Sequence, residues 1–179
     1  RMFIVLLRQY CFTGGMPEWL QAKRGTKDPI AVRTIQKNNL AAYESDMAKH
    51  AASETQRVRM VWQSVPEQLA RENKKFIYGA VRKGARAKDF EIAIQWLVDA
   101  GLVYKVNRVR DLKVPLRFYS DSNAFKLYLL DVGLLGAMTD APAASILIGD
   151  NIFSEYKGAF TENYVLQQIV TIPDRPTYY

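Results

Sequence analysis

Lysine and arginine side chains gather in the middle of the chain, and the chemistry they offer is the binding of anions. Residues 71–117 hold twelve Lys or Arg and five Asp or Glu, so this segment alone has a net charge of +7, which is also the net charge of the whole 179-residue chain. Charge confined to one segment favours a surface for an anionic partner such as DNA. The alternative is a solvated face that keeps the domain soluble. The candidate phosphate-binding residues are Lys74, Lys75, Arg82, Lys83, Arg86, Lys88, Arg108, Arg110 and Lys113.

No residue pattern that would catalyse a reaction or hold a cofactor stands out. One Cys and one His are too few to supply the four ligands of a structural zinc site. The stretches GGMPEW and RKGARAK contain glycine but lack the Lys-Ser/Thr pair of a phosphate-binding loop. We therefore expect no catalytic residue, no metal and no cofactor in this chain. Cys11 is expected to be a small buried side chain, and His50 an exposed residue on a helix.

The composition is that of a globular protein, with 49% hydrophobic and 12% aromatic residues. No apolar run approaches the roughly 20 residues that a membrane helix needs, so we expect no membrane span. A single cysteine fits a reducing compartment, and we expect a cytoplasmic protein.

Capping residues and hydrophobic periodicity predict a mainly α fold with a small β part. Helices are expected at residues 2–13, from Pro17, at 29–49, at 53–65 with Ser53 as N-cap, in a short turn from Pro66, and at 86–100 and 156–170. Asp28 before Pro29 and Gly101 after residue 100 mark helix boundaries. Residues 74–81 are β-rich, and residues 102–106 and 115–119 are predicted strands joined by a loop. The dense apolar segment 123–138 is expected in the core.

The helix predicted at 86–100 has a core stripe and an opposite, polar face. The stripe is Phe90, Ala93, Ile94 and Leu97. The polar face is Lys88, Glu91, Gln95 and Asp99. If this is the helix that enters a DNA groove, its two acids repel phosphates and only Gln95 is a candidate for reading a base. We therefore expect contacts to phosphates rather than recognition of a base sequence.

Two more apolar residues of this helix, and one acid in an apolar segment, could each have a structural or a functional role. Ile92 and Trp96 lie beside the core stripe and are expected in the core, although they would also suit a docking surface for another protein. Asp131 lies in the apolar run YLLDVGLL, where we expect a helix cap or a paired internal carboxylate.

Six phrases in order resemble one protein family. They are GGMPE at 14–18, AYESDMAKHA at 42–51, residues 64–106, PLRFYSD at 115–121, FKLYLLDVGLLGAM at 125–138 and YKGAFTENYVLQQI at 156–169. Together they resemble the C-terminal part of bacterial and archaeal AAA-type P-loop ATP-binding proteins, which carry a C-terminal winged-helix domain of unknown function. The resemblance implies a helical lid-like segment at 1–52, a winged helix-turn-helix domain at 53–121, and at 122–179 the start of a nuclease-like α/β unit. ATP and Mg would then bind to the N-terminal ATPase core of the parent protein.

Three functions follow from the resemblance and the charge pattern. The first is a non-catalytic region of a AAA-type ATPase whose winged helix contacts DNA non-specifically through phosphates. The second is a protein-interaction and assembly module of that ATPase, including assembly into a homo-oligomer. The third is a truncated restriction-endonuclease-like nuclease, in which Glu162 would be the family's helix acid. Without further acids Glu162 is expected to be solvent-facing or capping.

Overall fold

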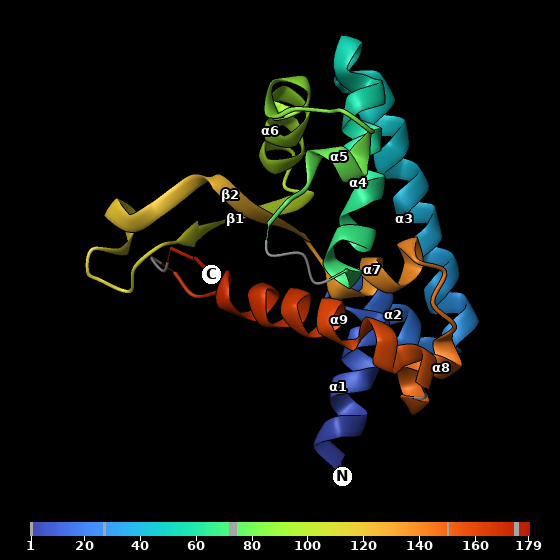
Figure 1. Cartoon of the computed structure of the whole chain (residues 1–179). Coiled ribbons are helices and arrows are strands. Elements are labelled where there is room, and N and C mark those ends of the chain that lie inside the picture. The colour runs from blue at the N-terminus through green and yellow to red at the C-terminus, as the bar shows by residue number, and fades with distance from the viewer. Residues whose placement is uncertain (1, 27, 72–74, 150, 174–175) are drawn as a thin grey trace.

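Helices make up most of the fold, and a two-stranded antiparallel ribbon projects from them as a wing (Figure 1). The computed structural model describes residues 2–26, 28–71, 75–149, 151–173 and 176–179. The α-helices are α1 (Met2–Thr13), α2 (Pro17–Thr26), α3 (Pro29–His50), α4 (Thr55–Ala70), α5 (Tyr78–Val81), α6 (Glu91–Asp99), α7 (Val132–Met138), α8 (Ala143–Ile148) and α9 (Asn151–Ile169). Short 3₁₀ helices are η1 (Ala52–Glu54), η2 (Ala87–Asp89) and η3 (Leu116–Tyr119), and the strands are β1 (Val103–Val109) and β2 (Ser120–Leu129). The predicted fold class, mainly α with a small β part, is confirmed.

The helix boundaries depend on local capping, and most of those predicted from capping residues are confirmed. The Asp28 carboxylate accepts the Ile30 N–H at 2.9 Å at the start of α3. Gly14 has a φ of 76°, and Pro17 is the first residue of α2. Gly101, with a φ of 69°, follows α6 as expected. Left-handed backbone of this kind favours glycine because a Cβ would clash.

Two predicted boundaries in the next segment are wrong. Ser53 is not an N-cap, because it lies inside η1 and α4 begins at Thr55. Pro66 does not begin a new turn but lies within α4. The apolar stripe explains the continuous helix, since it is buried on both sides of the proline: Val58, Val61, Trp62, Val65 and Leu69.

The strands also differ from prediction. Residues 115–119 form η3 rather than a strand, and β2 begins at Ser120 instead. The pairing joins Val103 to Leu129 and Val109 to Ser120, with an irregularity between Asn107 and Arg108. Burial favours this register, because Phe125, Leu127 and Leu129 of β2 are buried, whereas residues 115–119 are exposed or only partly buried. Of the β-rich segment 74–81, the described part makes one strand-like hydrogen bond, from the Phe76 N–H to the Phe125 carbonyl at 2.6 Å, before turning into α5.

A connected cluster of buried apolar side chains runs through all three predicted segments. It includes Met47 from the first, Trp62 and Leu97 from the second, and Leu134 and Phe160 from the third. Helix α1 packs against α7 and α8, and α3 packs against α4 and α7. Strand β2 runs across the predicted boundary between residues 121 and 122. The division into three domains stays a prediction.

Cys11 is buried and His50 is exposed, as expected. Among the helices in the described part of the chain, none is both long enough and apolar enough to cross a bilayer.

Candidate nucleic-acid interface

The first group of candidate cations lies on residues 74–88, in the segment that leads to α6. Of its members in the described part of the chain, Lys75, Arg82, Lys83, Arg86 and Lys88 are all exposed, whereas Lys74 lies outside the described residues. Asp89 organises this turn, because its carboxylate accepts the Arg86 N–H at 2.8 Å and lies 4.0 Å from the Arg82 guanidinium. The Arg86 hydrogen bond is also the largest cause that lowers the pKa of Asp89. Asp89 therefore fixes the backbone at Arg86 and lies beside the Arg82 guanidinium.

The second group lies on the wing, where one acid that sequence reasoning missed decides the geometry. The buried Asp121 carboxylate accepts from Arg108 at 3.0 Å and lies 3.2 Å from Arg110. It also accepts the Asn123 N–H at 3.0 Å. The Arg108 hydrogen bond, followed by that of Asn123, lowers the pKa of Asp121. We call this arrangement the Asp121 clamp.

The Asp121 clamp holds two guanidinium groups on one carboxylate, so it keeps one net positive charge. The Arg108 and Arg110 side chains are still 41% and 69% exposed, and their remaining N–H groups are open to an anion. At the end of the wing, Lys113 lies 3.8 Å from Asp111 and 5.9 Å from the centre of the Tyr119 ring. Only the strand pairing places Asp121 opposite Arg108, so no local signal identified it.

The exposed face of α6 is unsuited to reading bases. Phe90, Ala93, Ile94 and Leu97 are buried, which confirms the predicted core stripe. On the opposite face, the Gln95 amide donates to the Asp99 carboxylate at 2.7 Å. An amide bound to an acid is not free to pair with an adenine edge. The helix itself is also shorter than predicted, because residues 87–89 form η2.

Two apolar residues of α6 do not behave alike. Trp96 packs partly buried against the core, but Ile92 is 67% exposed, which contradicts its expected core position. Ile92 points away from α4 because it lies outside the stripe that packs there. It lines a groove of about 590 Å³ between α6 and the sheet.

The groove has one wall from α6 and one from the strands, and it carries both signs of charge. Glu91 and Gln95 lie on the first wall, and Lys105 and Asn123 lie on the second. The Lys105 ammonium lies 4.5 Å from the centre of the Phe125 ring. The groove thus offers aromatic and polar surface with charges of both signs.

Other polar groups prove structural. Asp131 is buried and caps α7, accepting the Gly133 N–H at 2.7 Å, as predicted. The Glu162 side chain is 40% exposed, in line with the expected solvent-facing position, and it also accepts from Lys126 at 2.8 Å and from the Tyr128 hydroxyl at 3.0 Å. Among the described residues, no three His, Cys, Asp or Glu side chains come together where they could hold a metal ion.

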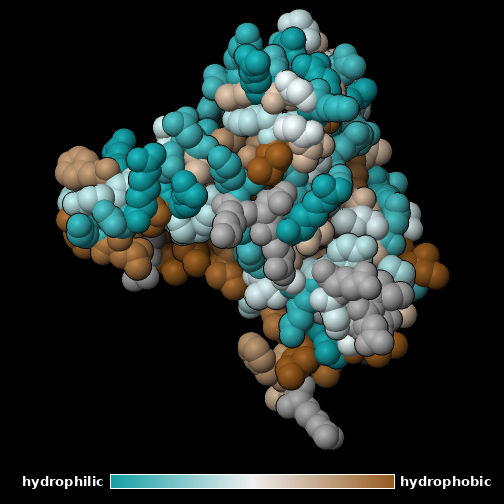
Figure 2. Space-filling model, in the orientation of Figure 1, coloured by the Kyte–Doolittle hydropathy of each residue, from teal (hydrophilic) through white to brown (hydrophobic). Residues whose placement is uncertain are grey.

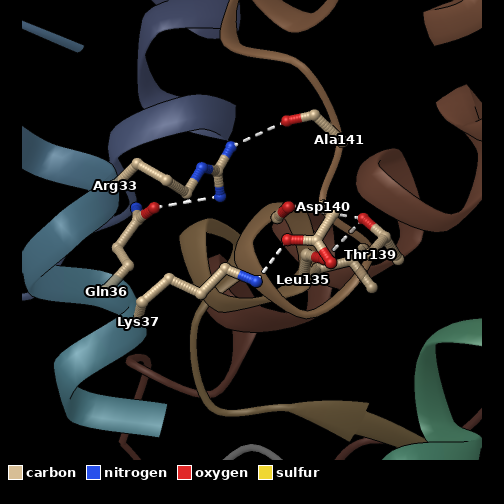
Figure 3. A network of polar contacts seen from close by, with 8 residues as sticks. Arg33, Gln36, Lys37, Leu135, Thr139, Asp140 and Ala141 are labelled. Atoms are coloured by element: carbon tan, nitrogen blue, oxygen red, sulfur yellow. Dashed lines mark hydrogen bonds and ion pairs between the residues drawn. The ribbon is translucent and has the colours of Figure 1, made fainter. Parts of the chain in front are cut away.

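A second polar network joins α3 to the segment after α7 (Figure 3). Arg33 donates to the Gln36 side chain at 3.0 Å and to the Ala141 carbonyl at 3.1 Å, and Lys37 binds Asp140. A groove of about 400 Å³ beside them is lined by residues of the same two segments. Because these groups pair with one another, we interpret the network as a structural connection between α3 and residues 140–141.

Comparison with known proteins gives one match. The model of a family described as Domain of unknown function (DUF8612) matches residues 4–145. No curated protein matches the chain, and neither does any solved structure.

Proposed function

The chain belongs to the DUF8612 family, and we propose that it is a non-catalytic, DNA-contacting region of a AAA-type ATP-binding protein. The wing and the turn before α6 contact phosphates of duplex DNA without reading its sequence. ATP and Mg bind elsewhere in the parent protein, which works in the cytoplasm. The link to AAA-type proteins rests on the resemblance of the six sequence phrases alone.

The observation that carries DNA contact is the Asp121 clamp. It holds Arg108 and Arg110 in fixed positions while leaving both guanidinium groups partly exposed. A cation held in place loses less side-chain entropy when it binds a phosphate. The exposed cations before α6 add further positive charge to the chain's surface. Since the α6 face offers Glu91 and Asp99, contact to phosphates is favoured over contact to bases.

Duplex binding is tested by fluorescence anisotropy with a labelled random duplex between about 50 and 300 mM salt. If about six cations engage phosphates, affinity falls by roughly three decades between 50 and 200 mM. The variant Lys83→Glu/Lys88→Glu should lower the slope of log affinity against log salt by about two. Both residues are exposed, so the fold is expected to survive.

The matched control is Lys49→Glu/Lys157→Glu, which changes the net charge equally at exposed positions on α3 and α9. It should bind DNA far more tightly than the test variant. Equal weakening in both variants would mean that total charge, not this surface, drives binding. No duplex binding at the lowest salt would refute the proposal.

One observation favours the second candidate function, a protein-interaction and assembly module. At the start of α1, Met2, Phe3, Ile4, Val5 and Leu6 are 50–79% exposed, and this end of the helix projects from the body (Figure 1). A helix that is apolar all round is usually buried against a partner. Analytical ultracentrifugation of the chain and of Phe3→Glu/Ile4→Glu tests this function. Self-association that the variant loses would support it, and a monomer at all concentrations would exclude the homo-oligomer.

A further inference from the structure

The tip of the wing exposes large apolar side chains beside cations. Leu112, Val114 and Phe118 are 88%, 91% and 82% exposed. Figure 2 shows the wing as an arm with hydrophobic atoms among hydrophilic ones. Single exposed apolar residues are ordinary, but three within seven residues at the end of a projection form a surface that a partner can cover.

The tip has a defined shape. The Phe118 N–H donates to the carbonyl of Pro115, the N-cap of η3, at 3.1 Å. The Arg110 N–H donates to the Tyr119 carbonyl at 2.9 Å and closes the loop at its base. The ring of Tyr119 lies under Lys113. The apolar side chains are therefore presented by an ordered loop, which reduces the entropy cost of inserting them into a partner.

The charge around the tip is complementary to a polyanion. Between residues 110 and 119 the cations are Arg110, Lys113 and Arg117, all exposed, and the acid is Asp111. Further cations continue down the ribbon at Arg108 and Lys105. Lys105 and Arg110 are five residues apart along the extended ribbon, so this row spans about 17 Å. A row of this length follows a phosphate backbone, whereas a bilayer headgroup layer would need cations only in a ring near the tip.

We propose that the wing tip is a wedge that enters the minor groove of duplex DNA. Phe118, with Val114 and Leu112 beside it, inserts between two base pairs, and Arg110, Lys113 and Arg117 contact the flanking phosphates. Apolar wedges of this kind unstack a base step and kink the duplex. Flexible pyrimidine–purine steps are the easiest to open, so they are the preferred sites. This inference rests on the proposed DNA contact and adds where and how the duplex is held.

The experiment measures duplex bending and binding separately. A duplex of about 20 base pairs with one central TA step, the flexible kind of step, carries a donor and an acceptor dye at its two ends. Energy transfer reports bending, and anisotropy of a singly labelled copy reports binding. The test variant is Val114→Ser/Phe118→Ser. Its control is Ile30→Ser/Ile148→Ser, which removes two apolar side chains that are 75% and 69% exposed on α3 and α8.

The full chain should raise energy transfer, and the control should do the same. The test variant should lose this rise and bind about tenfold more weakly, while its salt slope stays that of the unmodified chain because no phosphate contact is removed. Netropsin, which occupies the minor groove, should displace the chain. Thermal melting and circular dichroism confirm that both variants fold.

The failures of the two proposals are distinguishable. Salt-dependent binding without bending, or bending that the test variant retains, overturns the wedge and leaves the phosphate contacts standing. No binding by the unmodified chain overturns the proposed function as well. Binding to phosphatidylserine vesicles that the test variant loses, with unchanged duplex binding, also overturns the wedge and assigns the tip to a membrane surface.

Discussion

Replacing Asp131 by asparagine should destabilise the fold, because this carboxylate joins three distant parts of the chain. It is 1% exposed and accepts the Gly133 N–H at 2.7 Å, the Gly15 N–H at 2.7 Å and the Gln167 amide at 2.8 Å. It also accepts the Leu134 N–H. The turn between α1 and α2 is thereby tied to the start of α7 and to α9. Burial raises the pKa of Asp131, and these hydrogen bonds oppose that rise.

The size of the effect follows from counting donors and acceptors. The asparagine oxygen still accepts at the start of α7, but its NH₂ group then faces the donors of Gly15 and Gln167. Rotating the Gln167 amide would not restore the contact without loss, because its oxygen already accepts the Val132 N–H at 3.0 Å and that hydrogen bond would break. Two buried donors are left without acceptors, and a buried donor in that state costs about 1–3 kcal/mol. We expect Asp131→Asn to lower the free energy of unfolding by about 2–4 kcal/mol.

Urea denaturation followed by tryptophan fluorescence measures this change, since Trp19 and Trp62 are buried in the folded chain. Asp140→Asn is the control, because that side chain is 78% exposed and follows the same helix α7. The control should stay within about 0.5 kcal/mol of the unmodified chain. If Asp131→Asn also falls within that range, the network contributes little and the reasoning is refuted.

Two further predictions concern Gly14 and Asp121. Gly14→Ala and Gly84→Ala both place alanine at positive φ, which costs about 1 kcal/mol, but only at Gly14 would the new Cβ meet Asp131 and Trp19. Urea denaturation should therefore show a larger loss for Gly14→Ala, and equal losses would contradict this packing. The folded chain lowers the pKa of Asp121, so the ionised carboxylate stabilises the fold. This stabilisation is complete above the pKa of an aspartate in the unfolded chain, about 4, and is lost as the pH falls through the lower folded pKa. Asp121→Asn should flatten the decline in urea midpoint between pH 5 and pH 2, and an unchanged decline would argue against the clamp.

The candidate site was predictable in its charges but not in their arrangement. Each of the predicted cations within the described residues lies at least partly at the surface, because long charged side chains are rarely buried. The Asp121 clamp could not be predicted, since it depends on the register of β1 against β2. A shift of this pairing would carry Asp121 away from Arg108. The exposed tip was missed for a related reason, as residues 115–119 were expected to pair as a strand.

The sequence by itself determined the features that depend on neighbours within one or two turns. These are the cap at Asp28, the glycine after α6, the buried stripe of α6 and the cap at Asp131, each of which is set by contacts a few residues apart. Tertiary structure decided the rest: the continuity of α4 through Pro66, the start of β2, the exposure of Ile92 and the partners of Glu162. Such outcomes depend on which distant surfaces meet, and free energy from burial and pairing between distant residues outweighs weak local preferences.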